Sequence, residues 1–321
     1  MQIFRIPETS VRPTVLFSCL LLPLTLAVGA AKANAEDLYV AYAGSMGAVM
    51  DLHLGPDFAK TRGVDYRGEG QGAYGLARLI ADHKIRPDVF VSITPGPVEI
   101  LQQAGLVREA YPVASTQMCI AYSPDSPYAK DFAAAAQGKK PWYEVLQQPG
   151  VRFGRTDPRT DPQGQNIIFT MLLAERYYHI PGLAQKILGE QMNPQQILTE
   201  PSLLARLKNG QLAASSGYLS AVTSQKLPCV KLPPEINLSD PRYAKDWYDK
   251  VQFTISVDGK EKVVHPQPLV FYAAVLTDAP QPKLGQEFVD FLRSATGQKI
   301  FRDNGYSAPH GPAVEADNKK S

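Results

Sequence analysis

Three short glycine-containing segments each stand between a strand-like run and a helix-like run. They are Gly44-Ser45-Met46-Gly47, Gly70-Gln71-Gly72-Ala73 and Thr156-Asp157-Pro158-Arg159-Thr160-Asp161-Pro162-Gln163-Gly164. The first main-chain N–H groups of a helix have no partner inside the helix, and the helix dipole is positive there, so an anion is favoured at such a place. We therefore interpret all three segments as candidate anion-binding loops.

The first two segments would act mainly through the main chain. Gly44 lets the chain turn sharply and lets a ligand come close, and Ser45 adds a hydroxyl donor. Met46, Gly72 and Ala73 would contribute N–H groups. The glycine spacing of the second segment does not fit a dinucleotide-binding fingerprint. A plain structural alternative stays open for each: Ser45 as a helix N-cap, and the second segment as an ordinary loop.

The third segment contains the acidic candidate. Two Asp-Pro pairs favour an extended approach, Pro162 suits a first helical turn, and Gly164 would leave the N–H groups there open. Asp161 has two interpretations. It could cap the helix and satisfy those donors itself, or it could face a ligand.

The elements around these segments predict a two-lobed α/β fold. Strands at Leu38–Ala43, Val64–Arg67 and Val89–Val91 alternate with amphipathic stretches. Such alternation indicates a parallel sheet with right-handed crossovers, and ligands on such sheets bind beyond the carboxyl ends of the strands. We expect each lobe to be a mostly parallel sheet flanked by helices.

A second α/β domain is expected to begin after residue 117. Its predicted elements are the strands Thr116–Tyr122, Val151–Gly154 and Leu212–Ser215, the helices Trp142–Leu146, Ile167–Tyr178 and Leu203–Lys208, and a helix from about Tyr218. The Pro-rich run Leu227–Pro241 is predicted to be an extended surface segment. Asp258-Gly259 is a strong hairpin signal between two strands.

The last 55 or so residues are too few to fold alone. They comprise a strand within Pro266–Leu276 and two helices, Lys283–Arg293 and Gly297–Asn304. We expect this part to return to the first domain. Lobe I is then 36–117 with 266–321, lobe II is 118–265, and two chain crossings form a hinge.

Residues 1–35 resemble a cleaved secretion signal. Arg5 and Arg12 precede an apolar run over 15–28, and Ala33-Asn34-Ala35 offers small residues for a signal peptidase. Cleavage would remove Arg5, Arg12, Lys32 and Glu8 from totals of 33 basic and 31 acidic residues, leaving 30 of each. That balance argues against a nucleic-acid or anionic-lipid surface, because either would need a basic excess.

Cysteine and histidine usage points to no metal centre. Cys119 and Cys229 would remain after cleavage, either as a disulfide or as free buried thiols. The five histidines are scattered, and no Cys/His metal spacing occurs. A secreted hydrolase is a third hypothesis, but no Gly-x-Ser-x-Gly elbow occurs and no histidine is marked as a base.

Several segments, in this order and spacing, resemble a known family. They are Ala43-Gly44-Ser45-Met46, Asp88-Val89-Phe90-Val91, Thr156-Asp157-Pro158, Asp161-Pro162-Gln163-Gly164, Tyr218-Leu219-Ser220, Leu232-Pro233-Pro234-Glu235-Ile236-Asn237-Leu238, and Phe291-Leu292-Arg293-Ser294 with Gly297-Gln298. Together they are similar to the molybdate/tungstate-binding proteins of ABC importers, and most similar to the tungstate-type branch of these type II solute-binding proteins. The resemblance covers essentially the whole mature chain.

The resemblance implies a monomeric periplasmic receptor without cofactor or catalysis, which delivers an oxyanion to an inner-membrane ABC permease. It implies that the oxyanion is held between the lobes. Ser45 matches the family's first-lobe serine, Asp161 an aspartate offered to the metal, and Tyr218 a second-lobe tyrosine at or near the ligand.

Two departures from the family leave the choice of anion open. Ala73 stands where many members have serine, and Gly217 stands where tungstate-type members are expected to carry glutamate. Their loss would remove a hydroxyl donor and a carboxylate that could expand the metal's coordination. Other small anions, such as sulfate, phosphate or a carboxylate, therefore remain an alternative on the same fold.

Overall fold

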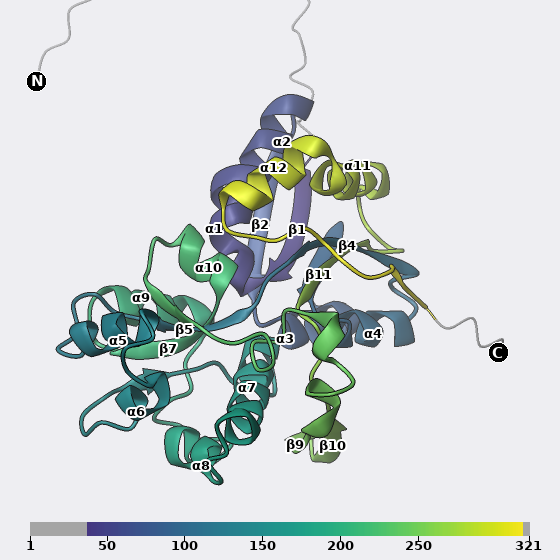
Figure 1. Cartoon of the computed structure of the whole chain (residues 1–321). Coiled ribbons are helices and arrows are strands. Elements are labelled where there is room, and N and C mark those ends of the chain that lie inside the picture. The colour runs from purple at the N-terminus through teal and green to yellow at the C-terminus, as the bar shows by residue number, and fades with distance from the viewer. Residues whose placement is uncertain (1–36, 317–321) are drawn as a thin grey trace, which may run out of the picture. The chain divides into compact units, whose positions relative to one another are not determined.

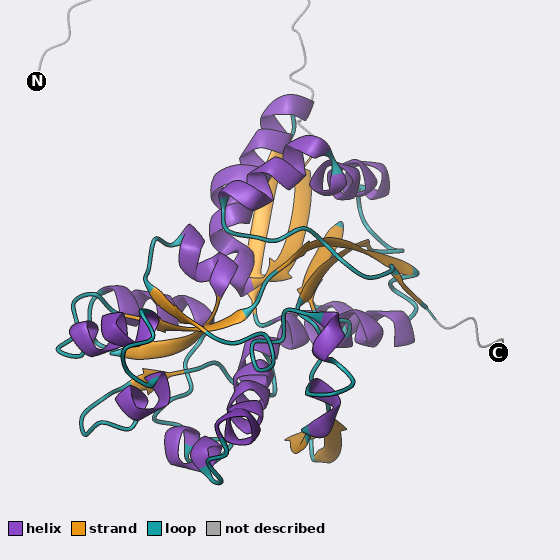
Figure 2. Cartoon of the chain, in the orientation of Figure 1, coloured by secondary structure: helices purple, strands orange, loops and turns teal. Residues whose placement is uncertain are grey.

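The computed structural model describes residues 37–316, which contain two large sheets and a separate hairpin (Figures 1 and 2). The predicted signal segment, residues 1–35, lies outside the described residues. The larger sheet has six strands in the order β12-β4-β11-β3-β1-β2. Their bounds are β1 Asp37–Ala43, β2 Asp65–Gln71, β3 Val89–Ile93, β4 Glu109–Ser115, β11 Val270–Val275 and β12 Val314–Glu315.

The larger sheet is mixed, so the prediction of a mostly parallel sheet is wrong. β1 runs parallel to β2 and β3, as the strand–helix alternation predicted. β11 lies antiparallel to both β3 and β4, and β12 is antiparallel to β4. The path of the chain explains this. β11 joins the larger sheet only after the chain has formed the second sheet, so no crossover helix connects it to a neighbouring strand in the parallel direction.

Helices cover both faces of the larger sheet (Figure 1). α3 and α4 lie on one side, and α2, α11 and α12 lie on the other. The helical segments that accompany this sheet are η1 Gly44–Met46, α1 Gly47–Val49, the π-helical η2 Met50–Leu54, α2 Gly55–Arg62, α3 Ala73–Ala81, α4 Gly96–Gln103, α11 Pro282–Arg293 and α12 Ala295–Asp303.

The second sheet has four strands in the order β6-β7-β5-β8. Their bounds are β5 Met118–Tyr122, β6 Phe153–Gly154, β7 Ala214–Tyr218 and β8 Cys229–Lys231. Only β6 and β7 are parallel, because β5 is antiparallel to both of its neighbours. The accompanying helices are α5 Ala129–Ala136, α6 Trp142–Leu146, α7 Pro162–Tyr178, α8 Leu183–Leu188, α9 Glu200–Lys208 and α10 Leu219–Ser224.

The run Leu227–Pro241 is not the surface segment that its prolines predicted. Its residues 229–231 form the edge strand β8, and Leu232, Ile236 and Leu238 are buried. Prolines flank β8 without interrupting its pairing, as is tolerated at a sheet edge. The buried Leu and Ile side chains explain why the rest of the run packs inward.

The remaining elements are two short turns of helix and a hairpin. They are η3 Pro241–Tyr243, η4 Tyr248–Lys250, β9 Phe253–Val257 and β10 Lys260–Val264. Asp258 and Gly259 join β9 to β10 with φ angles of 52° and 74°. Positive φ at both turn residues is the conformation that Asp-Gly favours, so the predicted hairpin is confirmed.

The chain passes from one sheet to the other beside its own return path. Thr116 and Gln117 join β4 to β5. The N–H of Thr116 donates to the carbonyl of Leu269 at 3.1 Å, and the Asn237 side chain donates to that of Gln117 at 2.7 Å. The crossing segments therefore lie side by side. Within residues 37–316 no helix is long and apolar enough to cross a membrane.

Candidate anion-binding site

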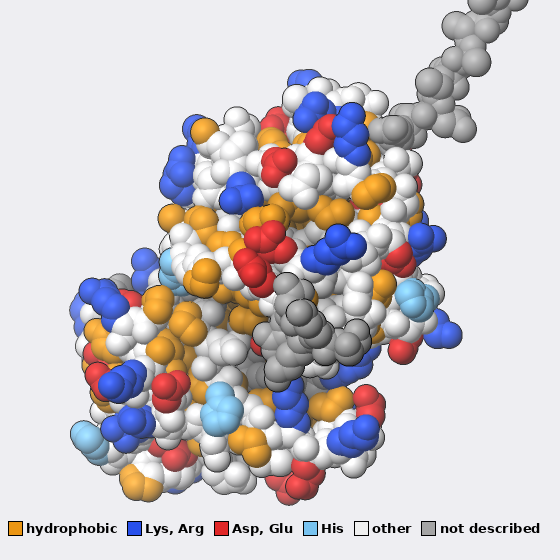
Figure 3. Space-filling model, turned by 90° about the vertical axis from the view of Figure 1, so that its right-hand side faces the viewer, with side chains coloured by type: hydrophobic (Ala, Val, Ile, Leu, Met, Phe, Trp, Pro, Cys, Tyr) orange, Lys and Arg blue, Asp and Glu red, His pale blue; other side chains and the backbone are white. Residues whose placement is uncertain are grey.

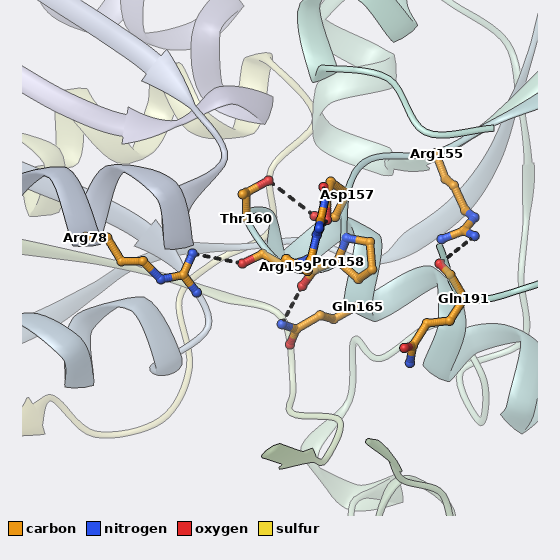
Figure 4. Close-up of polar contacts among 8 residues, drawn as sticks. All are labelled: Arg78, Arg155, Asp157, Pro158, Arg159, Thr160, Gln165 and Gln191. Atoms are coloured by element: carbon orange, nitrogen blue, oxygen red, sulfur yellow. Dashed lines mark hydrogen bonds and ion pairs between the residues drawn. The ribbon is translucent and has the colours of Figure 1, made fainter. Parts of the chain in front are cut away.

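The second and third candidate loops meet where the two sheets face each other. The N–H of Gly75, in the first turn of α3, donates to the carbonyl of Thr160 at 3.0 Å. Arg78, also on α3, donates to the carbonyl of Arg159 at 3.0 Å (Figure 4). A Cβ at Gly72 would lie 2.6 Å from the Thr160 oxygen, so only glycine allows this approach.

The first half of the second predicted loop, Gly70 and Gln71, is strand. β2 continues through residue 71, because Gly68 and Gly70 make room for neighbouring side chains. A Cβ at Gly70 would lie 2.6 Å from the Tyr42 ring, and one at Gly68 would lie 2.3 Å from an Asp51 oxygen. Gly72 is left as the junction before α3, with Ala73 fully buried as its first residue.

Asp161 caps α7. Its carboxylate accepts from the N–H of Gln163 at 2.9 Å, which is the N-cap arrangement. The side chain is only 7% exposed, and this burial raises its pKa to about 6 although the capping N–H opposes the shift. Asp161 is therefore both a cap and a buried group that binds a proton readily.

Gly164 serves packing in this structure. A Cβ there would lie 2.5 Å from the carbonyl oxygen of Thr156 and 2.6 Å from the nitrogen of Pro158. The N–H of Gly164 donates to the carbonyl of Asp161 at 3.1 Å, so it is not the open donor that the sequence suggested. Glycine is needed there because the loop folds back onto the helix.

Glu200 is the acidic group that sequence analysis missed. It is the first residue of α9 and is 5% exposed. Its carboxylate accepts from the Gln163 side chain at 3.0 Å. The main-chain N–H of Ser45 faces the same carboxylate. A Cβ at Gly44 would lie 2.8 Å from its Oε2. Glu200 thus reaches from the α9 end across to the first candidate loop.

Asp161 and Glu200 form a buried acidic pair. Burial is the main cause that raises the pKa of Glu200 well above its usual value, and the charge of Asp161 adds to it. Burial and the neighbouring negative charge both disfavour ionisation of Glu200 while Asp161 is ionised. Beside them, the hydroxyl of Ser45 is buried without a hydrogen-bond partner among residues 37–316. This hydroxyl is a donor that is free for a ligand.

The first loop presents main chain and one hydroxyl to the pair. Met46 is fully buried in the core, so only its main chain could contact a ligand. Beside Ser45, a cavity of about 330 Å³ lies between η1 and α9 and is lined by Gly44, Ser45, Pro201 and Leu204 among others. The first loop and the start of α9 therefore border one hollow.

Tyr218 lies on the same side of β7 as α7. Its hydroxyl accepts from the Asn166 side chain at 2.9 Å. The Ser216 hydroxyl donates to the side-chain oxygen of Gln163 at 2.8 Å. Burial first, and then the charge of Asp161, raise the pKa of Tyr218 well above its usual value. The hydroxyl of Tyr218 therefore stays protonated next to the acidic pair.

Gly217 faces the opposite way. A Cβ there would lie 2.7 Å from Val222 and 3.8 Å from the sulfur of Cys119, inside the second core cluster. A side chain at position 217 would therefore point away from the acidic pair. Position 217 therefore does not decide whether the candidate site contains a carboxylate, because Glu200 from another element lies near Asp161.

Sequence offers only a weak signal for Glu200. An acidic residue in a first helical turn is common, since it interacts well with the helix dipole. The apolar pattern alone began this helix at Leu203, three residues late. The described residues contain no group of three or more His, Cys, Asp or Glu side chains that could hold a metal cation.

Comparison with known proteins places the chain in a family. The sequence profile of the bacterial extracellular solute-binding protein family matches residues 38–307. The chain belongs to this family. It is 29% identical over 292 residues to the molybdate/tungstate-binding protein WtpA of Pyrococcus abyssi, with 83% of each chain covered.

Solved structures of this solute-binding kind share the fold. The Azotobacter vinelandii periplasmic molybdate-binding protein matches with a TM-score of 0.62 at 16% identity, covering 85% of this chain and all of its own. The sulfate-binding protein SubI of Mycobacterium tuberculosis matches with a TM-score of 0.54 at 13% identity, covering 85% and 87%. At these identities the likeness establishes the two-lobed α/β fold of the solute-binding protein and leaves its ligand open.

Proposed function

We propose that this solute-binding protein is the periplasmic receptor of an ABC importer and that it binds molybdate or tungstate beside Asp161 and Glu200. The observation that carries the proposal is the buried acidic pair, with the main-chain N–H of Ser45 against Glu200 and the Ser45 hydroxyl buried without a partner among residues 37–316. Gly44, Ser45, Met46, Gly72, Ala73 and Tyr218 complete the proposed site.

The acidic pair supports a metal oxyanion over sulfate or phosphate. Two ionised carboxylates would repel any dianion. Molybdenum and tungsten, however, can accept further oxygen ligands, and carboxylate oxygens are suited to such hard centres. Sulfur and phosphorus in their tetrahedral oxyanions do not expand their coordination in this way. Protons held by the pair could instead donate to the anion's oxygens. Coordination of the metal by the carboxylates should release these protons, whereas donation to the anion should retain them.

The sheet arrangement supports lobes at 36–117 with 266–321 and at 118–265. The Thr116-Gln117 crossing and the returning chain beside it would act as the hinge. Differential affinity for the closed arrangement would drive closure over the anion. The closed protein, a monomer without cofactor, would then dock on its permease.

Export and surface charge fit this role. We propose that the signal segment is cleaved after residue 35. On the face shown in Figure 3, basic and acidic side chains are interspersed over the surface, as the balanced charge of the mature chain predicted. Such a surface suits a diffusible receptor rather than a nucleic-acid-binding protein.

The environment of Ser45, the candidate nucleophile, argues against a hydrolase. The Ser45 hydroxyl has no hydrogen-bond partner in the described chain, so no base is held against it. Nucleophilic catalysis by serine requires such a base.

Calorimetric titration of the mature protein with molybdate, tungstate, sulfate and phosphate tests the proposal. We expect tight binding of the two metal oxyanions. The dependence of the heat on buffer ionisation enthalpy measures the protons exchanged, and proton release would indicate coordination of the metal by the carboxylates. Absence of binding of both molybdate and tungstate would overturn the ligand assignment. Tight binding of sulfate or phosphate instead would establish the alternative on the same fold.

A further inference from the structure

We infer that Arg155 is a positioning residue that holds Glu200 against Asp161. The inference rests on the proposed function and deepens it, because it names the group that sets the distance between the two carboxylates. Arg155 follows β6 and immediately precedes the loop that leads to Asp161. Its side chain reaches the segment 190–199, which leads to Glu200.

Arg155 holds that segment through both its main chain and its side chain. Its N–H donates to the carbonyl of Gln196 at 2.8 Å, and its carbonyl accepts from the N–H of Leu198 at 2.9 Å. Its Nε donates to the Gln196 side chain at 3.0 Å. Its Nη2 donates to the carbonyl of Glu190 at 2.9 Å. It also donates to the carbonyl of Gln191 at 2.8 Å (Figure 4).

The segment 190–199 has little regular structure of its own. It contains turns and a single β-bridge, which pairs Ile197 with Arg155 itself. Gln196, the side-chain partner of Arg155, also donates to the carbonyl of Ile187 at 2.8 Å. The path of the chain into α9 therefore depends on contacts that converge on Arg155.

The burial of the charged Arg155 side chain is energetically unfavourable for the fold. Its side chain is fully buried, and none of the ion pairs among residues 37–316 includes it. Its Nη1 has no hydrogen-bond partner in the part of the chain that the structure describes. Burial lowers the pKa of Arg155 to about 10, so it is still charged at neutral pH. The charge of Asp157 opposes this shift without forming a direct ion pair with Arg155. A buried charge that no direct ion pair offsets destabilises a fold, whereas an apolar residue of similar size would not.

Arg155 joins the two segments that lead to the acidic pair. The loop after it contains Asp161, and the segment bound by its guanidinium ends at Glu200. Gln163, two residues beyond Asp161, already donates to Glu200 across this junction. A guanidinium binds carbonyl oxygens in a fixed planar geometry that a lysine or glutamine cannot reproduce. Arg155 therefore fixes where α9 begins relative to the acidic pair.

The primary test is a double-mutant cycle read by calorimetry with molybdate. Arg155→Gln removes the charge, and Arg155→Lys keeps it but lacks the planar fork. Either change in the wild-type background should weaken molybdate binding by about 10- to 100-fold. This is the loss of affinity expected when a residue that orients a ligating side chain is mutated. In a Glu200→Gln background, Arg155→Gln should weaken binding by less than about two-fold, because it acts through Glu200.

A core variant separates positioning from general destabilisation. Phe132→Leu alters the packing against Tyr122 in the same lobe, and Phe132 lies on α5 rather than on α7, α9 or the segment 190–199. Its effect on affinity should be the same in the wild-type and Glu200→Gln backgrounds. If Arg155→Gln also weakens binding equally in both, or if both Arg155 variants bind as wild type does, the inference is overturned.

Amide hydrogen exchange keeps the inference testable whatever the ligand is. In Arg155→Gln and Arg155→Lys without any anion, the amides of residues 190–200 should exchange faster while those of α7 keep their rates. Unchanged exchange in 190–200 would overturn the positioning role. Failure of the wild-type protein to bind molybdate and tungstate would overturn the proposed function instead, and the exchange result would still decide the role of Arg155.

Discussion

The two carboxylates of the candidate site are held in different ways. Asp161 is fixed by its own neighbourhood: it caps the helix that follows it, and a proline stands directly after it. Glu200 is fixed by residues that are distant in sequence, with Gln163 and Ser45 facing its carboxylate and Arg155 holding the segment before it. A locally held group should tolerate changes elsewhere, whereas the position of Glu200 should depend on both lobes.

The largest expected effect is on Glu200 itself. Glu200→Gln should weaken molybdate binding by about 30-fold or more, because loss of a charged contact in a buried site costs about 2 kcal/mol or more. Titration calorimetry measures the change. Glu190→Gln is the matched control, since it is the same substitution on an exposed side chain at the start of the same segment and should bind as wild type does. Equal affinity in Glu200→Gln would remove Glu200 from the site.

Two substitutions of Asp161 distinguish its role as a helix cap from its proposed contact with the ligand. Asp161→Ala should lower the free energy of unfolding by about 0.5–2 kcal/mol, because the cap is lost. Asp161→Asn keeps a capping oxygen and should retain most of that stability. Both should weaken molybdate binding, since both remove the carboxylate. Wild-type affinity in Asp161→Asn, measured beside urea unfolding of the same sample, would show that Asp161 is a cap alone.

The raised pKa of Asp161 predicts how stability depends on pH. The folded-state pKa, about 6, lies above the unfolded value of about 3.9. Its contribution is therefore fully present below the unfolded pKa and is lost as pH rises through the folded one. Urea unfolding of the ligand-free protein between these limits should show the wild type losing stability relative to Asp161→Asn as pH rises. An unchanged difference between the two proteins would contradict the raised pKa.

Gly217 should show the smallest effect on binding. Gly217→Ala places a Cβ against Val222 and should destabilise the protein by about 1–3 kcal/mol, as overpacking of a core does. Molybdate affinity should stay unchanged, because that Cβ points away from both carboxylates. Val222→Ala in the same chain should recover part of the lost stability. A large loss of affinity in Gly217→Ala would place this position in the site after all.

Local patterns determined much of the fold and one of the two carboxylates. The strand–helix alternation from Leu38 to Gly105, the Asp258-Gly259 hairpin and the cap at Asp161 depend on contacts within a few residues. Their residue types therefore predict them directly. The return of the C-terminal strand to the larger sheet followed from a size argument, since so short a segment cannot bury a core of its own.

Tertiary structure alone decided the direction of β11, the burial of Leu232, Ile236 and Leu238, and the position of Glu200 near Asp161. Each of these features depends on contacts between segments that are distant in sequence, and local sequence patterns do not predict such contacts. An acidic residue in the first turn of a helix looks the same whether water or a second carboxylate faces it. Only the packing that brings α9, α7 and the Ser45 loop together buries Glu200 beside Asp161, and this burial gives the pair its chemistry.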